Sequence, residues 1–177
     1  MSVTTDVPSK AGSAPAVPLW SSRAPSRPAA TRLLMISLAS IIALGSLALL
    51  GEVSGHLLLI PPMAASMALV SSAPLSPLSQ PRSVIGGHSI AAVVGVCAGL
   101  VSHSVWAAVI AGGLTIGITL WMRMPHSPAA ATAVIGTLAT TEQVAFVVCS
   151  VIAACVLVAF EILRSRLSRG SYPVYWI

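Results

Sequence analysis

Residues 62–66 read Pro-Met-Ala-Ala-Ser, and residues 128–132 read Pro-Ala-Ala-Ala-Thr, which is the same small-residue pattern 66 positions later. Each stretch lies in a short apolar run, 57–73 or 127–139, that follows one long apolar run and precedes another. The second short run cannot cross a membrane as one complete helix. Paired Pro-interrupted segments in the two halves of a chain are typical of transporters built from internal repeats, whose site lies at the breaks. The layout therefore predicts two repeats of three segments, each with a broken middle segment.

The long apolar runs cover residues 33–51, 84–101, 105–122 and 143–163 and approach the length that spans a bilayer. Of the 177 residues, 56% are apolar and only 7% are charged, and the mean hydropathy is +0.94. An ordinary soluble domain carries about 25% charged residues. So few charged side chains cannot cover a soluble enzyme, and a disordered chain would be poor in apolar residues. We therefore predict an all-α integral membrane protein.

The basic residues decide between four and six passages. If both broken segments cross, Arg82, Arg123 and the cluster at 164–169 lie on the side of the N-terminus, and Glu52 and Glu142 lie on the other side. If both segments re-enter, Arg82 and Arg123 are left outside. Basic residues concentrate in cytoplasmic loops, so the net charge of +5 reflects orientation and not nucleic-acid binding. We predict six passages with both termini cytoplasmic, and two inverted repeats of three passages each.

The composition divides the chain into two tails and a membrane domain. Residues 1–32 are rich in Pro, Ser and Ala and have no continuous apolar run, which predicts a disordered cytoplasmic tail. Residues 33–164 form the predicted membrane domain, with repeats at about 33–101 and 105–163. Residues 165–177 are a basic and aromatic C-terminal tail.

Two Gly-x-x-x-Gly patterns lie in the long runs, at residues 95–99 and 113–117. Such patterns let helix backbones approach each other closely. We interpret both as helix-packing features.

One stretch is far more particular than generic membrane sequence: Ser76-Pro77-Leu78-Ser79-Gln80-Pro81-Arg82-Ser83-Val84-Ile85-Gly86-Gly87-His88. It resembles the SPLxQPRxxIGGH signature of the HPP integral membrane family. That family is named after a His-Pro-Pro motif followed by Ala-Gly-Ala-Thr-Ala, and residues 126–133 read His-Ser-Pro-Ala-Ala-Ala-Thr-Ala, with Ser127 and Ala130 as departures. The resemblance covers about residues 33–163. It implies a small membrane protein, and it implies a small-anion substrate because some plastid and cyanobacterial relatives are described as nitrite transporters.

Four polar residues in and beyond this signature are candidates for substrate contact, namely Gln80, Arg82, His88 and His126. Arg82 is equally suited to anchor the topology or to contact an anion. His88 lies inside an apolar run, where a polar side chain needs a reason to be present. It is either a hydrogen-bonded interior histidine or a donor that faces a cavity, and the resemblance strengthens the second interpretation. His126 precedes the second broken helix, where it would cap the helix or line an entrance.

In the six-passage arrangement, the half-helices that begin at Pro62 and Pro128 point their N-termini at each other near the midplane. Helix N-termini offer unpaired N–H groups and about half a positive charge, so two facing ends form an anion site without a buried Arg or Lys. Small residues there would let the anion reach the amides, although they also serve packing alone. Hydroxyls one turn in would donate to the anion or bond their own backbone. The predicted substrate-binding set is Pro62, Ala64, Ala65, Ser66, Gln80, Arg82, His88, His126, Pro128, Ala130 and Thr132.

No catalytic constellation is recognisable in the core. The last Asp is Asp6, Lys10 is the only lysine, and no Ser has a G-x-S-x-G setting. We therefore expect no enzyme activity, no cofactor and, because no two His have helical i, i+3 or i, i+4 spacing, no metal site.

The predicted function is membrane transport of a small, nitrite-like inorganic anion, and the alternative is a non-catalytic assembly or scaffold subunit. The expected partners are the lipid bilayer and the anion, with no nucleic acid. For a chain this small we expect a homo-oligomer, although no motif fixes the number of subunits. A bacterial inner membrane is favoured as its location over a plastid envelope.

Overall fold

The computed structural model describes residues 26–176, and every regular element in this range is a helix, which confirms the all-α prediction there. Most of the predicted N-terminal tail lies outside the described residues. Three of the helices, α1, α3 and α6, are long and apolar enough to cross a membrane. The elements in chain order are α1 (Ala30–Ser54), α2 (Pro61–Ser72), the 3-10 turn η1 (Pro77–Ser79), α3 (Pro81–Val101), α4 (Val105–Trp121), α5 (Ala129–Leu138) and α6 (Gln143–Leu167).

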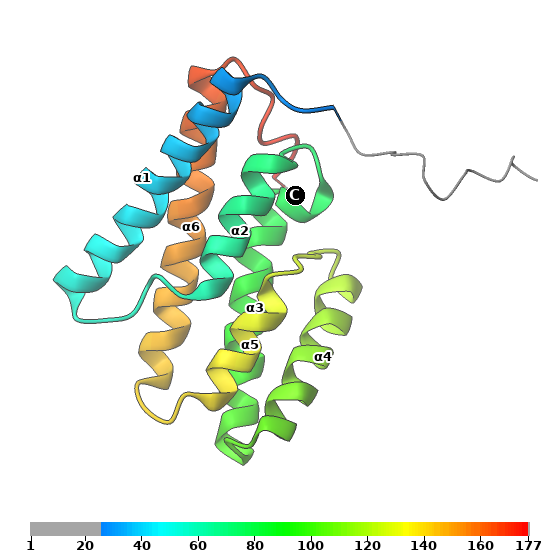
Figure 1. The fold of residues 1–177 in the computed structure, drawn as a ribbon. Coiled ribbons are helices and arrows are strands. Elements are labelled where there is room, and N and C mark those ends of the chain that lie inside the picture. The colour runs from blue at the N-terminus through cyan, green and yellow to red at the C-terminus, as the bar shows by residue number, and fades with distance from the viewer. Residues whose placement is uncertain (1–25, 177) are drawn as a thin grey trace, which may run out of the picture.

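The six α-helices alternate in direction along the bundle, and the two described ends of the chain lie at the same end of it (Figure 1). The short helices α2 and α5 have 12 and 10 residues, so at about 1.5 Å per residue each is roughly half as long as a bilayer is thick. In Figure 1, α2 occupies the upper half of the bundle and α5 the lower half, and both N-termini lie near the middle.

Prolines set where the short helices begin. Pro61 and Pro62 occupy the first turn of α2, and Ile60 before them is extended. Proline suits the first turn because its missing N–H would be unpaired there, and it forces the preceding residue out of the helical region. α5 likewise begins directly after Pro128. The predicted starts at Pro62 and Pro128 are therefore each within one residue of the observed ones.

The helix α3 lies at the centre of the bundle, where it packs most extensively against α5 and also contacts α4 and α6. A Cβ atom built on Gly95 would lie 2.9 Å from Ala133 Cα, and one on Gly99 would lie 3.0 Å from the Thr137 carbonyl oxygen. The packing role predicted for the first Gly-x-x-x-Gly pattern is therefore confirmed, because only glycine lets α5 approach this closely.

The same prediction is wrong, within this chain, for Gly113 and Gly117. A Cβ on either glycine meets no atom within 4 Å. The helix α4 buries its opposite face, on which Ala111 and Thr115 lie. These two glycines therefore face outward.

The C-terminal tail folds back onto the bundle. The chain remains helical to Leu167, two residues beyond the predicted start of the tail. The Tyr172 amide then donates to Ser165 Oγ at 3.0 Å, and the Val174 amide donates to Gln80 Oε1 at 2.9 Å. The tail is thereby tied to the loop between α2 and α3.

Candidate functional site

His88, in the middle of α3, connects the two short helices through both of its ring nitrogens. Its Nε2 lies 2.7 Å from Ser66 Oγ in α2, and its Nδ1 lies 2.8 Å from Thr132 Oγ1 in α5. All three side chains are completely buried. The two hydroxyls occupy the last position of the two Pro-x-Ala-Ala-(Ser/Thr) stretches, so the matched motifs make matched contacts with one imidazole ring.

His126, in the connection between α4 and α5, is the second histidine of this cluster. Its Nε2 lies 2.8 Å from Ser66 Oγ, and its Nδ1 lies 2.8 Å from the Leu78 carbonyl oxygen. The rings of His88 and His126 meet edge to face, with their centroids 4.9 Å apart. The hydroxyl of Ser66 also lies 2.8 Å from the Pro62 carbonyl oxygen one turn earlier in α2. We call Ser66, His88, His126 and Thr132 the histidine cluster.

The pair Gly86-Gly87 lets the connection that carries His126 lie directly on α3. A Cβ on Gly87 would come within 2.7 Å of His126 Cβ, and a Cβ on Gly86 would overlap the Met124 side chain. Any larger residue would push the connection outward and lift His126 from Ser66. This explains the Gly-Gly-His sequence as two residues that allow the close approach, followed by the imidazole that contacts Ser66 and Thr132.

The remainder of the 76–88 stretch holds the loop that receives His126. Ser76 Oγ accepts from the Leu78 amide and begins η1, whose Leu78 carbonyl then accepts from His126. Gln80 donates to the Pro74 and Ser76 carbonyls at 2.9 and 3.0 Å. Gln80 is fully buried and uses both ends of its amide on backbone groups, so it shapes the loop and does not reach the cluster.

The other predicted site residues lie around the cluster and not in it. Arg82 donates to the Met122 carbonyl at 3.2 Å, which ties the start of α3 to the end of α4. Pro62 contributes its carbonyl to Ser66, and Pro128 lies just before α5.

The structure corrects the placement of the alanines. Ala64 and Ala65 are on the exposed side of α2, because successive helical residues rotate by about 100° and the buried side contains Met63, Ser66 and Met67. Ala130 is half-buried and lies toward Gly112 of α4, whose added Cβ would be 3.7 Å from the Ala130 carbonyl oxygen. These alanines therefore do not line the histidine cluster.

Two cavities lie in opposite halves of the bundle, and one of them touches the cluster. One of about 180 Å³ is lined by His126 together with Leu78, Thr119 and Pro125. Another of about 250 Å³ is lined by Ile60, the residue before α2, together with His56, Glu142 and Phe146. A liquid water occupies about 30 Å³, so either cavity has room for a small hydrated ion. Ser66, His88 and Thr132 are completely buried and line neither cavity.

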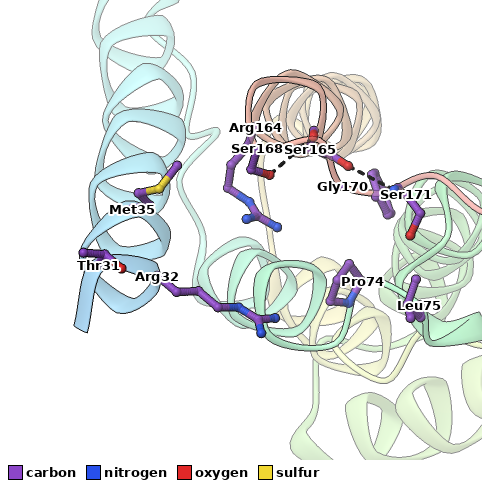
Figure 2. Close-up of a pocket in the computed structure, with 11 residues that line it drawn as sticks. Thr31, Arg32, Met35, Pro74, Leu75, Arg164, Ser165, Ser168, Gly170 and Ser171 are labelled. Atoms are coloured by element: carbon purple, nitrogen blue, oxygen red, sulfur yellow. Dashed lines mark hydrogen bonds between the residues drawn. The ribbon is translucent and has the colours of Figure 1, made fainter. Parts of the chain in front are cut away.

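A third cavity, of about 450 Å³, opens where α1 and α6 meet the C-terminal tail (Figure 2). Arg32 from α1 and Arg164 from α6 point into the same opening. Burial, together with the charge of Glu161, raises the pKa of the Tyr172 hydroxyl at its edge. No residue of the histidine cluster lines this cavity.

Sequence reasoning missed the buried carboxylate of Glu161 in α6. It is completely buried, forms an ion pair with Arg164 and lies 3.5 Å from Ser71 Oγ. The signal was available, because opposite charges three residues apart on a helix face the same side. The pair neutralises the carboxylate, so it offers no free negative charge to a cation.

The histidine cluster combines two imidazoles with two hydroxyls from the N-terminal halves of α2 and α5, and within residues 26–176 no carboxylate contacts it. Such a site supplies hydrogen-bond donors without permanent negative charge, which suits a small anion better than a cation. Nowhere in the described range do three His, Cys, Asp or Glu side chains gather as they would around a metal ion.

A family model described as "HPP, transmembrane region" matches residues 25–173 of the chain. The comparisons with curated proteins and with solved structures give no match.

Proposed function

Because the chain belongs to the HPP transmembrane family, an integral membrane family, we propose that it transports a small, nitrite-like inorganic anion across the bilayer. The observation that carries the proposal is the meeting of α2 and α5 at one buried histidine, where Ser66 and Thr132 each contact a nitrogen of His88. The facing N-terminal halves of two helices provide a positive potential at that point. We infer that the anion binds beside this cluster.

The proposal includes six passages arranged as two inverted repeats. It is supported by the alternating helix directions and by the opposed short helices in Figure 1. Arg82 lies in the first turn of α3, Arg123 follows α4 and Arg164 lies in the last turn of α6. These basic residues therefore share one end of the bundle, whereas Glu52 and Glu142 lie at the other. Positive charge at one end predicts that this end is cytoplasmic. We place the protein in a bacterial inner membrane, with homo-oligomer formation and an absence of enzyme activity as parts of the same proposal.

The test is anion flux in proteoliposomes, with nitrite and formate compared with chloride and nitrate. We expect flux of nitrite that protein-free liposomes lack. Ser66→Ala should lower it about tenfold, because it removes a hydrogen-bonding group worth roughly 1.4 kcal/mol. Ser72→Ala is the matched control, since Ser72 lies on the same helix but is exposed and bonds only the Leu69 carbonyl.

The alternative function is a non-catalytic scaffold or assembly subunit, and the same experiment distinguishes it. A scaffold carries no anion even when it is correctly inserted and monodisperse. Absence of flux for every anion of the panel in the well-folded wild type would overturn the transport proposal.

A further inference from the structure

The histidine cluster has one hydrogen fewer than its contacts require. Five contacts of 2.7–2.8 Å join Ser66, His88, His126 and Thr132 to one another and to the Pro62 and Leu78 carbonyls. Each hydrogen bond needs one hydrogen. Two neutral imidazoles and two hydroxyls supply only one each. With neutral histidines, one of the five contacts therefore brings two lone pairs together.

The carbonyl groups locate the missing hydrogen. A carbonyl oxygen only accepts, so His126 Nδ1 must carry the hydrogen that points to Leu78, and the contact between Ser66 and Pro62 is a hydrogen bond only when the Ser66 hydroxyl donates to the carbonyl. His126 Nε2 and Ser66 Oγ then face each other without a hydrogen at 2.8 Å.

One added proton on His126 Nε2 satisfies the whole cluster. Ser66 then accepts from both rings and donates to the Pro62 carbonyl, which uses its full capacity. His88 donates from Nε2 and accepts from Thr132 at Nδ1.

The surroundings of the two rings provide no negative charge to pair with that proton. The helices α2, α4 and α5 contain no charged residue. The charged groups nearby are Arg82 on α3, which donates to Met122, Arg123 in the connection before His126, and Glu161 on α6, whose carboxylate binds Arg164. A buried cation without a partner is costly, so an imidazolium here requires an anion from outside.

We propose that the cluster binds one proton at His126 Nε2 together with each transported anion, so that the protein is a proton–anion symporter. This inference rests on the proposed transport function. The proton enters from water in the 180 Å³ cavity that His126 lines. Its N–H bond is the one bond formed on loading, and on release that bond breaks and the proton passes, together with the anion, to water on the other side of the bilayer. For a monovalent anion the loaded site is neutral, which lowers the cost of moving it through the bilayer.

The test measures proton and nitrite movement together in proteoliposomes that contain a pH-sensitive dye. Flux through protein-free liposomes is subtracted at neutral to alkaline pH, because nitrous acid itself crosses lipid. We expect one proton per nitrite, no response to membrane potential, and accumulation that rises about tenfold per unit of pH gradient. Nitrite flux that is electrogenic and moves no protons would overturn the symport and leave the transport function intact. Absence of nitrite flux in the wild type would overturn both.

Variants and spectroscopy assign the proton to its atom. His126→Asn keeps a donor for the Leu78 carbonyl but binds no proton, so it should lose the accumulation driven by the pH gradient. The matched control is His103→Asn, because His103 Nδ1 also contacts a backbone carbonyl, that of Thr137, but lies outside the cluster. In the intact wild type, nitrogen-15 NMR should show one histidine becoming an imidazolium when nitrite is added. An unchanged histidine spectrum with bound nitrite, or accumulation in His126→Asn equal to that of the control, would refute the assignment.

Discussion

Gly95 is the position where one added methyl group should most disturb the packing that holds the cluster together. A Cβ there would lie 2.9 Å from Ala133 Cα and 3.0 Å from its carbonyl carbon, whereas ordinary contacts are 3.4–4 Å. These atoms belong to the backbone of α5, so no side-chain rotation relieves the overlap. The nearest atom, the Ala133 carbonyl oxygen, would overlap the added Cβ, so α3 and α5 must move apart in an interior packed like an organic crystal.

The size of the effect follows from two opposing contributions. Overpacking of this kind costs about 1–3 kcal/mol. Replacing a glycine inside a helix by alanine gains about 1 kcal/mol in helix propensity. Gly113→Ala isolates the gain, because Gly113 is also helical but has open space around it. The free energy of unfolding should therefore be about 1–3 kcal/mol lower for Gly95→Ala than for Gly113→Ala.

The assay is thermal unfolding of both purified variants and the wild type in the same detergent, followed by tryptophan fluorescence. For a chain of this size 1 kcal/mol shifts the melting temperature by about 2–4 °C, so Gly95→Ala should melt about 3–10 °C below Gly113→Ala. Equal melting temperatures, or a higher value for Gly95→Ala, would refute the close approach of α3 and α5. The anion flux of Gly95→Ala should also fall, because these two helices hold His88 against Thr132.

Three further results are expected. Gln80→Leu removes two bonds to loop carbonyls and one from the C-terminal tail, so at about 1 kcal/mol per bond it should destabilise the fold by roughly 3 kcal/mol and speed tail cleavage in limited proteolysis. Arg164→Gln should lower the melting temperature more than Glu161→Gln, because it leaves a completely buried carboxylate unpaired, at a cost of about 3–5 kcal/mol. Glu161→Gln costs less, because the unpaired Arg164 lines an open cavity. The opposite order would contradict the burial of Glu161. In a cysteine-free background, Arg123→Cys should react with a membrane-impermeant maleimide only from the cytoplasmic face and Glu52→Cys only from the external face; labelling of both from one face would refute six passages.

The bounds of the helices could be predicted because two strong signals coincide in this chain. Long apolar runs mark the four longer helices, and prolines mark where the short ones begin. The residue types of the cluster were also predictable. His88 is a polar residue inside an apolar run, and Ser66 and Thr132 occupy the last positions of the two matched motifs, so all three stand out in the sequence.

The side of each short helix that is buried could not be predicted. An amphipathic helix reveals its buried side by its polar stripe, but α2 contains only apolar and small residues with serines on several sides. Nothing in that pattern tells Ala64 or Ala65 from Ser66. The role of the Leu78 carbonyl was hidden for another reason, because a backbone acceptor leaves no trace in residue identity. Gln80 suggested an anion contact, yet its amide serves the loop and the tail.

The cluster also shows that two matched sequence stretches can form a site that is not symmetric. Ser66 and Thr132 occupy equivalent positions of the two matched stretches, and they contact opposite nitrogens of the same ring. The histidines have no such equivalents, since the residue 66 positions after His88 is Ala154 and the residue 66 positions before His126 is Ile60. The hydroxyls that contact His88 are therefore duplicated, whereas the proposed proton site exists once, beside the cavity that His126 lines. The single proton site must therefore open to the two sides of the membrane in turn, because a symported proton is loaded on one side and released with the anion on the other.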